Sequence, residues 1–512
     1  MTLHENLKRR VSEAIGRRDF PLAEQLCHDA EGSVATAELA FIRGVLASAR
    51  GDLVNAVALL AQAHAAAPQR SDIAYNYGVV LQQSGRTLEA AAAWQQATAS
   101  DPGNTAAWVN LALATLQLGD EQAALDVYRR ALNHHATNRD LLYNYANLLF
   151  RAGELQKSEA IYKKLLGVRP DDGPAWINYA KLLKTQQRLD ESEAAHRQAI
   201  AHAHPADAAR AHYNFANLLL SQGKWRDGFA AYEWRLRLSD AIGSPWPLPA
   251  WHESLPQGSR ILLWNDQGQG DAIMYLRFAS LLGARGYRLF AFVQNSLRTL
   301  AATAPGIKAA FGPTDARQRM DAQLPLCSLP HALGLETIDV CNEPYLVAPP
   351  IDPTVLGAAV PGRRRIGIAW AGNPAHANDA HRSVSLDQFA LLFGAPDVDW
   401  VSLQVGDRAS ELAASPYRER VHDLSAQLAD FAATASVMSG LDLVISIDSA
   451  PAHLAGALGR PVWTLIPAID TDWRWGRGAA TTSWYPTMRL FRQSRPGDWT
   501  TVMTAMRMAL RQ

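Results

Sequence analysis

The chain has 512 residues, of which 48% are hydrophobic and 19% charged, and its 49 basic and 49 acidic residues cancel to a formal net charge of zero. This length is too great for one compact core, so we expect two to four domains. The balanced charge argues against a general affinity for nucleic acid or for acidic membrane surfaces. The composition is that of a globular protein.

The cysteines and the N-terminus indicate the compartment. Cys27, Cys327 and Cys341 have neither metal-ligand nor redox spacing, and they suit a reducing environment. The N-terminal residues lack the apolar core of a signal peptide, and no segment reaches the roughly 18 apolar residues that a membrane-spanning helix requires. We therefore expect a cytoplasmic protein with no membrane span.

The first half of the chain repeats itself every 34 residues. The turn glycines at this spacing are Gly51, Gly85, Gly119 and Gly153. The small residues at the same spacing are Gly44, Gly78, Ala112, Ala146 and Ala180. Each period reads as a helix, a glycine turn and a second helix, with a left-handed backbone at the glycine and a close approach of the two helices at the small residue.

This period resembles the tetratricopeptide repeat, whose units stack into a superhelix with a concave groove that usually binds protein or peptide. A further unit, shifted by two residues, covers residues 211–236, and the residues before Glu38 resemble a capping unit. The repeat array is therefore predicted over residues 1–237. A connector rich in proline and aromatic residues follows at 238–258.

One polar column runs through the repeats. Its members are Asn76, Asn110, Asn144, Asn178 and, after the shift, Asn214. Each lies on the first helix of its unit, which lines the concave face in this repeat family. An asparagine amide can donate to and accept from a peptide backbone, but it can equally bond the neighbouring repeat. The column resembles the asparagine ladder of the O-linked N-acetylglucosamine transferases, which grips substrate protein backbone.

The second half alternates strands and helices, which predicts parallel sheets covered on both faces. The predicted strands are 260–264, 287–293, 364–372, 398–404, 442–448 and 461–467. A proline-rich break at 347–353 separates two series. Ligands of such sheets bind beyond the carboxyl ends of the strands, where the polar clusters of this half fall.

The first cluster is the loop "NDQGQGD" with Gly270 and Asp271. As a dinucleotide fingerprint the loop is weak, because Ile273 occupies the place of the third glycine. We expect Asp271 at the N-cap of the following helix. It can serve as a cap or as a general base that takes a proton from an acceptor hydroxyl.

The second cluster is the loop 371–383, which is rich in Asn, His and Arg. Arg382 and Ser383, beside a predicted helix start, suit a phosphate. Asn373 in the same loop and Gln404 after the next strand are further candidates for binding a donor substrate. A metal site at His376, Asp379 and His381 is an alternative of low specificity, and a solvated loop is another.

The third cluster is Asp448, Ser449 and His453, where a buried strand meets a helix. Ser449 and the free amides that follow would face a diphosphate at the positive end of the helix. Asp448 could accept from a sugar hydroxyl and His453 could donate to phosphate. The alternatives for these three residues are helix capping and simple packing. The residues Trp473, Arg474 and Trp475 are expected to line or brace the site, and packing between the lobes is the alternative for them.

The stretches "GDAIMYLRFASLL" and "IDSAPAHLAGALGRPVWTLIP" resemble the heptosyltransferase-like glycosyltransferases. The longer pattern is similar to the bacterial subgroup that fuses such a domain to tetratricopeptide repeats. The resemblance implies a GT-B fold, in which two Rossmann-like lobes face a cleft. The acceptor lobe would span 259–350, the donor lobe 351–497, and a last helix at 498–512 would cross back.

The resemblance also implies a mechanism: Asp271 as catalytic base, with Asp448, Ser449 and His453 at a nucleotide-sugar donor, and metal-independent inversion without a cofactor. It implies transfer to a protein acceptor held by the repeats, with flagellin as the first guess, and allows a homodimer. Two departures are the short first lobe and the missing phosphate-binding lysine, for which Arg382 is the substitute. The alternatives are an adaptor that only binds a nucleotide sugar, and an enzyme with a glycan or lipid acceptor.

Overall fold

The computed structural model describes residues 3–339, 342–376, 378–469, 471–476 and 478–511. The chain divides into two compact units, Met1–Ala203 and His204–Gln512, and each is described by itself. No helix in the described parts of the chain is long and apolar enough to cross a membrane. Cys27 and Cys327 are buried free thiols, while Cys341 lies outside the described residues.

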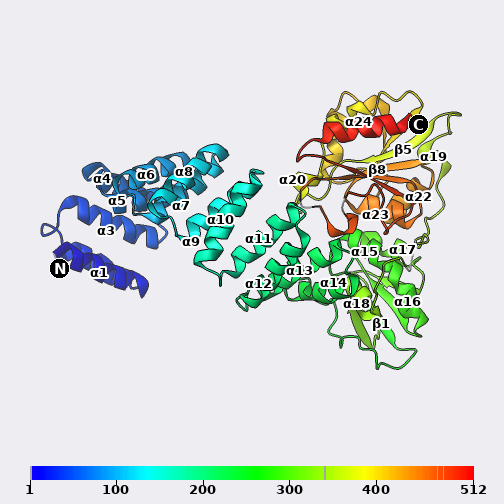
Figure 1. Cartoon of the computed structure of the whole chain (residues 1–512), viewed down its shortest axis with the longest axis horizontal. Helices are drawn as coiled ribbons and strands as arrows, with labels where there is room; N and C mark the ends of the chain where they lie inside the picture. Colours follow the sequence, from blue (N-terminus) through cyan, green and yellow to red (C-terminus); the bar gives the residue numbers. More distant parts are fainter. Residues whose placement is uncertain (1–2, 340–341, 377, 470, 477, 512) are drawn as a thin grey trace. The chain divides into compact units, whose positions relative to one another are not determined.

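Unit 1 is a stack of helix pairs (Figure 1). The pairs are α1 (Leu3–Gly16) with α2 (Phe20–Asp29), α3 (Thr36–Ala49) with α4 (Leu53–Ala66), α5 (Ser71–Gln83) with α6 (Thr87–Ser100), α7 (Thr105–Gln117) with α8 (Glu121–His134), α9 (Arg139–Arg151) with α10 (Leu155–Val168), and α11 (Gly173–Thr185) with α12 (Leu189–Ala201). The expected capping unit before Glu38 is thus a helix pair of its own. The fold class predicted from the 34-residue period is confirmed.

The small-residue column explains how the helices of a pair touch. A Cβ atom on Gly44 would lie 2.6 Å from Leu60 Cγ, and one on Gly78 would lie 2.6 Å from Trp94 Nε1. Each of these partners belongs to the second helix of the same pair. Glycine is therefore required wherever the partner side chain presses on the first helix.

The turn glycines have the predicted left-handed backbone, with φ of 82° at Gly51 and 78° at Gly153. The next position in this column is Gln187, which has no glycine but keeps the conformation, with φ of 65°. The column resumes at Gly223, after the two-residue shift, with φ of 73°.

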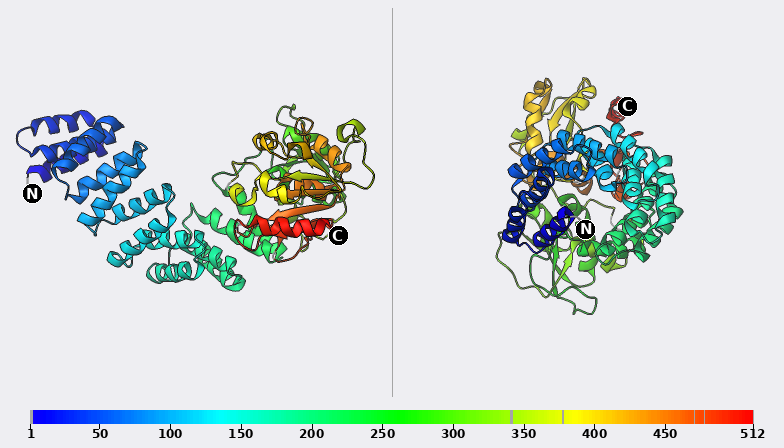
Figure 2. Two further views of the ribbon diagram at one scale, coloured as in Figure 1. Left: turned by 90° about the horizontal axis from the view of Figure 1, so that it is seen from above. Right: turned by 90° about the vertical axis from the view of Figure 1, so that its left-hand side faces the viewer.

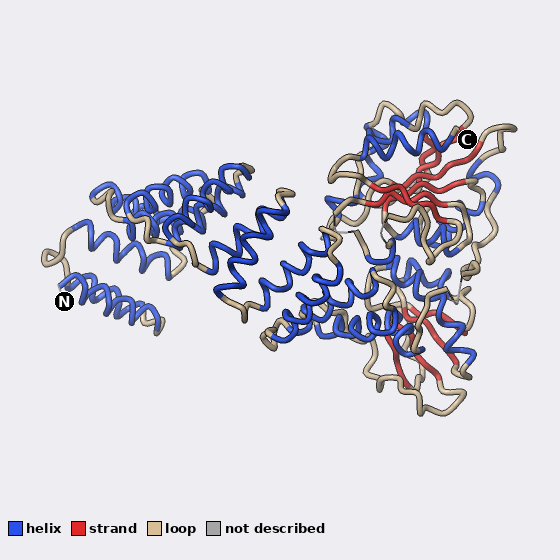
Figure 3. Tube along the Cα trace, viewed as in Figure 1, coloured by secondary structure: helices blue, strands red, loops and turns tan. Residues whose placement is uncertain are grey.

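Unit 2 begins with another helix pair, α13 (Ala208–Ser221) and α14 (Trp225–Tyr232), followed by the short 3-10 helix η1 (Glu233–Arg237). This pair is the last repeat in sequence, yet it is part of the compact unit that holds both sheets. Figure 3 shows the two sheets as separate sets of strands within this unit.

The N-terminal lobe has a parallel sheet in the order β3-β2-β1-β4. Its strands are β1 (Arg260–Trp264), β2 (Arg288–Phe292), β3 (Ile307–Phe311) and β4 (Ala322–Pro325). Its helices are α15 (Gln269–Tyr275), η2 (Leu276–Phe278), α16 (Ala279–Ala284), α17 (Asn295–Ala301), η3 (Leu326–Ser328) and α18 (Leu329–Leu333). The single helix expected after the glycine loop is broken by η2.

The C-terminal lobe has a parallel sheet in the order β10-β9-β8-β5-β6-β7. Its strands are β5 (Arg364–Ala369), β6 (Val398–Ser402), β7 (Val421–Asp423), β8 (Leu443–Ile447), β9 (Val462–Ile466) and β10 (Met488–Arg492). Its helices are α19 (Pro353–Leu356), α20 (Asp379–Arg382), η4 (Leu386–Leu391), η5 (Asp407–Ala409), α21 (Ser410–Ala414), η6 (Arg418–Arg420), α22 (Phe431–Ser439), α23 (Ala450–Ala457), η7 (Trp473–Trp475) and α24 (Trp499–Leu510). Two parallel-sheet lobes match the predicted GT-B arrangement.

The last helix does not do what the sequence analysis expected. The apolar face of α24, with Trp499 and Met503, joins the buried core of the C-terminal lobe and contacts η4 and β10. Among the described residues, its packing therefore completes the lobe that it follows in sequence, as Figure 2 also shows, instead of crossing to the other lobe.

Candidate functional site

Helix α15 of the N-terminal lobe packs against α23 of the C-terminal lobe (Figure 1), and α17 packs against α22. A Cβ atom on Gly270 would lie 2.9 Å from His453 Cδ2 and 3.6 Å from Ala450 Cα. The missing side chain at position 270 therefore lets the first turn of α23 approach the first turn of α15. Two of the three predicted clusters are brought together in this way.

Asp271 is the third residue of α15, and Gly268, not Asp271, is the N-cap. Its Oδ2 accepts a hydrogen bond of 3.0 Å from the Gly268 amide, which is one half of a capping box, because glycine has no side chain to make the other half. Its Oδ1 accepts a hydrogen bond from Nη2 of Arg474, in the other lobe. The expected N-cap position was thus wrong by three residues, because the glycine loop itself supplies the extended cap residue.

Burial and charge act in opposite directions on this carboxyl group. Burial raises the pKa of Asp271 above its usual value, while the Arg474 guanidinium lowers it. The side chain keeps 23% of its surface exposed. A carboxylate that is close to solvent and less acidic than usual is suited to accept a proton.

The sequence analysis placed Arg474 in a segment that lines or braces the site but did not predict its ionic contacts. The residue lies in η7, its side chain is 8% exposed, and its Nη1 lies 2.7 Å from Asp472 Oδ2. Its guanidinium carbon lies 4.6 Å from the centre of the Trp473 ring. Within the described residues its Nε is buried without a hydrogen-bond partner. The signal available in the sequence was a cation beside an acid in an aromatic segment, "TDWRW".

The aromatic neighbours of Arg474 have a bracing role. Trp473 is 5% exposed and packs edge-on against Phe229 and Tyr232 of the last helix pair. Trp475 is 1% exposed, and its ring centre lies 5.2 Å from that of His453. The bracing alternative therefore describes the two tryptophans, and the arginine between them faces the site.

Asp448 follows β8 at the carboxyl edge of the sheet. Burial, and then the nearby charge of Asp472, raise its pKa to about 6, against the opposing effect of Arg382 and Arg474. Arg382 also donates from Nη1 to the Asp448 backbone carbonyl over 3.1 Å. Asp448 thus titrates close to neutral pH, and Arg382 is held at the strand end by a backbone contact.

Ser449 is the N-cap of α23, with an extended backbone and no side-chain cap hydrogen bond. Its Oγ lies 3.3 Å from Ser446 Oγ. One turn later, His453 Nδ1 lies 3.0 Å from the Tyr485 hydroxyl, and burial lowers its pKa well below the usual value. His453 is therefore a neutral imidazole, and when Tyr485 donates to Nδ1, Nε2 carries the proton and is a hydrogen-bond donor.

The loop 371–383 has mainly internal contacts. Ser383 Oγ donates to Asp379 Oδ1 over 2.8 Å and accepts from the Gly372 amide over 3.0 Å. Asn373 is exposed and closes a turn on the Ala375 amide. Within the described residues no group of three metal-ligating side chains forms, so His376, Asp379 and His381 do not come together as that alternative requires.

Gln404 bonds the backbone throughout. Its Oε1 accepts from the amides of Trp370 and Ala371 over 3.0 and 2.9 Å, and its Nε2 donates to the carbonyls of Ala371 and Val405. The residue is 4% exposed. These contacts hold the loop that carries Asn373. Both the oxygen and the nitrogen of the Gln404 side-chain amide are therefore already hydrogen-bonded.

The asparagine column separates into two groups. Asn178 donates to the Tyr143 hydroxyl and to Asn147 Oδ1, and Asn76 donates to the Asp72 carbonyl of its own helix. No side-chain hydrogen bond of the remaining members occurs within the described chain. These members are Asn110, Asn144 and Asn214, and all are partly exposed. The amides of the second group are available for a ligand.

A buried ion pair fixes the last helix pair to the N-terminal lobe. Arg235 in η1 and Asp266 after β1 have side chains 0% and 1% exposed, and their Nε and Oδ2 lie 2.7 Å apart. Arg235 also donates to Ser328 Oγ over 2.8 Å, and the Cys327 amide donates to Asp266 over 3.2 Å. The first acid of the loop "NDQGQGD" is therefore structural.

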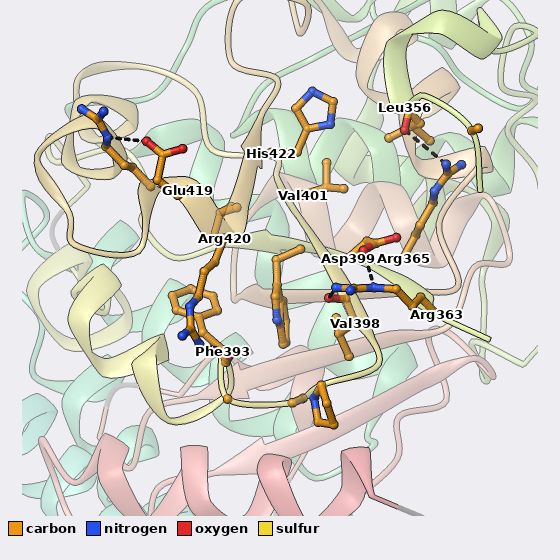
Figure 4. Close-up of a pocket in the computed structure, with 17 residues that line it drawn as sticks. Leu356, Arg363, Arg365, Phe393, Val398, Asp399, Val401, Glu419, Arg420 and His422 are labelled. Atoms are coloured by element: carbon orange, nitrogen blue, oxygen red, sulfur yellow. Dashed lines mark hydrogen bonds and ion pairs between the residues drawn. The ribbon is translucent and has the colours of Figure 1, made fainter. Parts of the chain in front are cut away.

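A separate pocket of about 610 Å³ lies beside the amino ends of β5, β6 and β7, on the edge opposite to the predicted ligand edge (Figure 4). Figure 4 shows Arg363 beside Asp399, and Arg365 reaching the backbone near Leu356. Arg420 donates to the Phe393 carbonyl over 3.2 Å. These arginines are bonded within the lobe, so the pocket is distinct from the candidate site.

Comparison with known families agrees with this organisation. Residues 75–140 and 115–182 match models of the tetratricopeptide repeat, and residues 407–471 match glycosyltransferase family 9 (heptosyltransferase). The chain thus has tetratricopeptide repeats and a heptosyltransferase-family domain. The family 9 match includes the third cluster, Asp448, Ser449 and His453.

Among individual proteins, Protein FlbA of Caulobacter vibrioides is 26% identical over 345 residues, which cover 60% of this chain. The chain spans 56% of the length of FlbA. Solved structures that match include the MamA protein, with 19% identity over 35% of this chain and 95% of that chain at a TM-score of 0.31. A repeat protein from Cytophaga hutchinsonii has 14% identity over 45% of this chain and 95% of that chain at a TM-score of 0.39. Scores this low carry no argument about function.

Proposed function

We propose that the chain is a glycosyltransferase that moves a sugar from a nucleotide-sugar donor to a Ser or Thr hydroxyl of a protein acceptor. The observation that carries this proposal is the meeting of Asp271 with the heptosyltransferase-family helix α23. The carboxylate comes from one lobe and the donor-binding candidates from the other, as a reaction between two substrates requires.

In the proposed mechanism, Asp271 takes the proton of the acceptor hydroxyl as its oxygen attacks the anomeric carbon. The bond between that carbon and the diphosphate oxygen breaks, and the nucleoside diphosphate leaves with the bonding electrons. Attack opposite to the leaving group inverts the anomeric configuration. We propose that Ser449, His453 and the Ala450 amide at the start of α23 receive the diphosphate, without a metal ion. The next residue of the helix is Pro451, which has no amide proton.

The repeats supply the acceptor side of the proposal. Tetratricopeptide repeats bind polypeptides, and the unbonded amides of Asn110 and Asn144 can pair with a backbone without reading its side chains. The likeness to repeat-fused enzymes makes flagellin the first acceptor to test, and the enzyme would then act in the cytoplasm. A purely nucleotide-binding adaptor is the second candidate, favoured by the contact between Asp271 and Arg474, which leaves the proposed base bound.

A thermal-shift panel of UDP-, GDP-, ADP-, TDP- and CMP-sugars on the wild type and on Asp448→Ala tests the donor site. A ligand at 100 times its dissociation constant adds about 2.7 kcal/mol of stability. We expect one nucleotide class to shift the wild type and to shift the variant less. If no class shifts the wild type, the donor proposal is wrong.

Transfer is then measured by mass spectrometry of flagellin with that donor. We expect Asp271→Asn to lose transfer while it still binds the donor, because an amide accepts the same cap hydrogen bond but cannot take the proton. Full transfer by Asp271→Asn would exclude it as the base. Donor binding without transfer by the wild type to any protein would favour the adaptor.

A further inference from the structure

Arg474 is held between two carboxylates from different parts of unit 2. Asp472 is its neighbour in the chain, whereas Asp271 lies 203 residues earlier, in the other lobe. The arginine side chain is 8% exposed, and its Nε has no partner among the described residues. A buried guanidinium with an unused donor can bond a further anion without losing its place.

The same arginine lies within electrostatic reach of the donor-binding candidates. Its charge acts on the carboxyl of Asp448 and on the imidazole of His453. Trp475, the next residue, packs at a tilt against His453. Arg382, the cation expected for phosphate, is turned to the Asp448 carbonyl and to Asp379. Arg474 is thus a further cation at this edge, and it is better buried than Arg382.

The contact with Arg474 conflicts with the proposed work of Asp271. One carboxylate oxygen accepts the Gly268 amide and the other accepts the guanidinium, so an acceptor hydroxyl would have to share an oxygen with one of them. Bonding to a cation also favours the ionised form and makes the carboxylate a weaker base. Loss of this contact would make Asp271 a stronger base.

We propose that Arg474 exchanges partners, binding Asp271 while the donor site is empty and the diphosphate of the nucleotide sugar once it is filled. This inference rests on the proposed function and adds the residue that links the two substrates. Donor binding would free the carboxylate, so that the acceptor hydroxyl meets an active base only when the sugar is in place.

The exchange has a thermodynamic signature, because Asp271 and the diphosphate compete for one guanidinium. Removing the charge of Asp271 should strengthen diphosphate binding, which is the opposite of what damage to a binding site produces. The test is calorimetric titration of the full chain with UDP, GDP, ADP and TDP. We expect Asp271→Asn to bind one of them at least about fivefold more tightly than the wild type does, since couplings of this kind span about 5- to 150-fold.

Arg474→Gln should weaken the same binding by about tenfold or more, as loss of a charged hydrogen bond does. In the Arg474→Gln background, Asp271→Asn should no longer tighten binding, which isolates the coupling between the two residues. Arg474→Lys keeps the charge and should recover part of the affinity. Arg420→Gln, which removes an arginine from the same lobe at the opposite edge, is the matched control and should leave binding unchanged.

The outcomes separate the two proposals. Diphosphate binding that is equal in the wild type and Asp271→Asn overturns the exchange and leaves the glycosyltransferase proposal standing. Tightening of equal size in both Arg474 backgrounds also overturns it. If neither the wild type nor Asp271→Asn binds any of the nucleotides, both proposals fail. Should Arg474→Gln not fold, the comparison is made in the Arg474→Lys background, where the tightening caused by Asp271→Asn should be smaller than in the wild type.

Discussion

At the scale of single residues, the site depends on Gly270, because a side chain at this position would collide with the other lobe. A methyl group there would meet the His453 ring at 2.9 Å, and inserting a group into such a contact typically costs about 1–3 kcal/mol. We expect Gly270→Ala to move α15 away from α23 and to weaken nucleoside diphosphate binding by about tenfold or more. Gly394→Ala, where a Cβ meets nothing within 4 Å, is the control. Equal affinities in the two variants would contradict this role.

The raised pKa of Asp448 predicts how stability depends on pH. In the unfolded chain this carboxyl ionises near its ordinary value, whereas in the folded protein it ionises at about 6. Between these values the folded state binds the extra proton, so the contribution of Asp448 to stability falls as pH rises and is most unfavourable above pH 6. We expect Asp448→Asn to remove this unfavourable contribution to the free energy of unfolding. Urea unfolding of both proteins at pH 4.5, 6 and 7.5 should give a stability gap that widens in favour of the variant.

The residues of the site were predictable to different degrees. Asp448, Ser449 and His453 lie in one short stretch after an apolar strand, so the sequence alone indicates their shared edge. The contact of Arg474 with Asp271 depends on how two lobes fold against each other, and no local pattern reports it. Gln404 shows the opposite case: its position after a strand indicated a ligand, but the backbone amides of Trp370 and Ala371, just after β5, bond it.

At the scale of elements, the turn column has one conflict, at Gln187. Its left-handed backbone costs a residue with a Cβ about 1–2 kcal/mol, which glycine avoids at an entropic cost of about 0.4–1 kcal/mol. We expect Gln187→Gly to stabilise unit 1 by about 0.5–1 kcal/mol. The reverse change, Gly153→Gln, should destabilise it by a similar amount. The urea midpoints of both variants, measured by circular dichroism, check these two stability changes. A loss of stability in Gln187→Gly would contradict the claim that the Gln187 backbone is strained.

The asparagine column yields a prediction that separates binding from packing. The amides of Asn110 and Asn144 are unbonded in the described chain, so the double change to Ala should weaken acceptor binding by about 5- to 100-fold, at about 0.5–1.5 kcal/mol for each lost hydrogen bond. Asn178→Ala removes bonds to Tyr143 and Asn147 and should mainly lower stability. Fluorescence anisotropy with labelled acceptor and thermal unfolding distinguish the two. Unchanged acceptor affinity in the double variant would remove the ladder proposal.

Elements were predictable where a pattern is long or repeated. The 34-residue period predicted the helix pairs. The apolar runs around Leu262, Ile368 and Ile445 predicted strands that lie in the middle of the sheets. Strands β3, β4, β7 and β10 were missed because they are short or carry charges, as in the "VHD" of β7 and the "MRLFR" of β10. An edge strand of a parallel sheet is stabilised by its pairing with the neighbouring strand. The composition of the segment itself does not predict that pairing.

At the scale of the whole molecule, the repeat pattern and the compact units end at different places. The array was predicted to stop at residue 237, but the division lies at 203, because α13, α14 and η1 pack with the N-terminal lobe through Arg235 and Asp266. We expect residues 204–512 to unfold cooperatively as one body. Residues 238–512 should lose about 3–5 kcal/mol, the usual cost of removing one partner of a buried ion pair. Calorimetry of the two fragments decides, and equal stability would place the boundary at 237.

The position of that division has an engineering consequence. The Arg235–Asp266 ion pair and the helix packing described for the α/β lobes lie within residues 204–512, so they would be kept if 34-residue modules upstream of residue 203 were deleted, duplicated or exchanged. The final helix pair would serve as a constant adapter, and the modules before it as a replaceable cassette. A chain built in this way could bind new partner proteins through exchanged repeats while the α/β lobes stay unchanged.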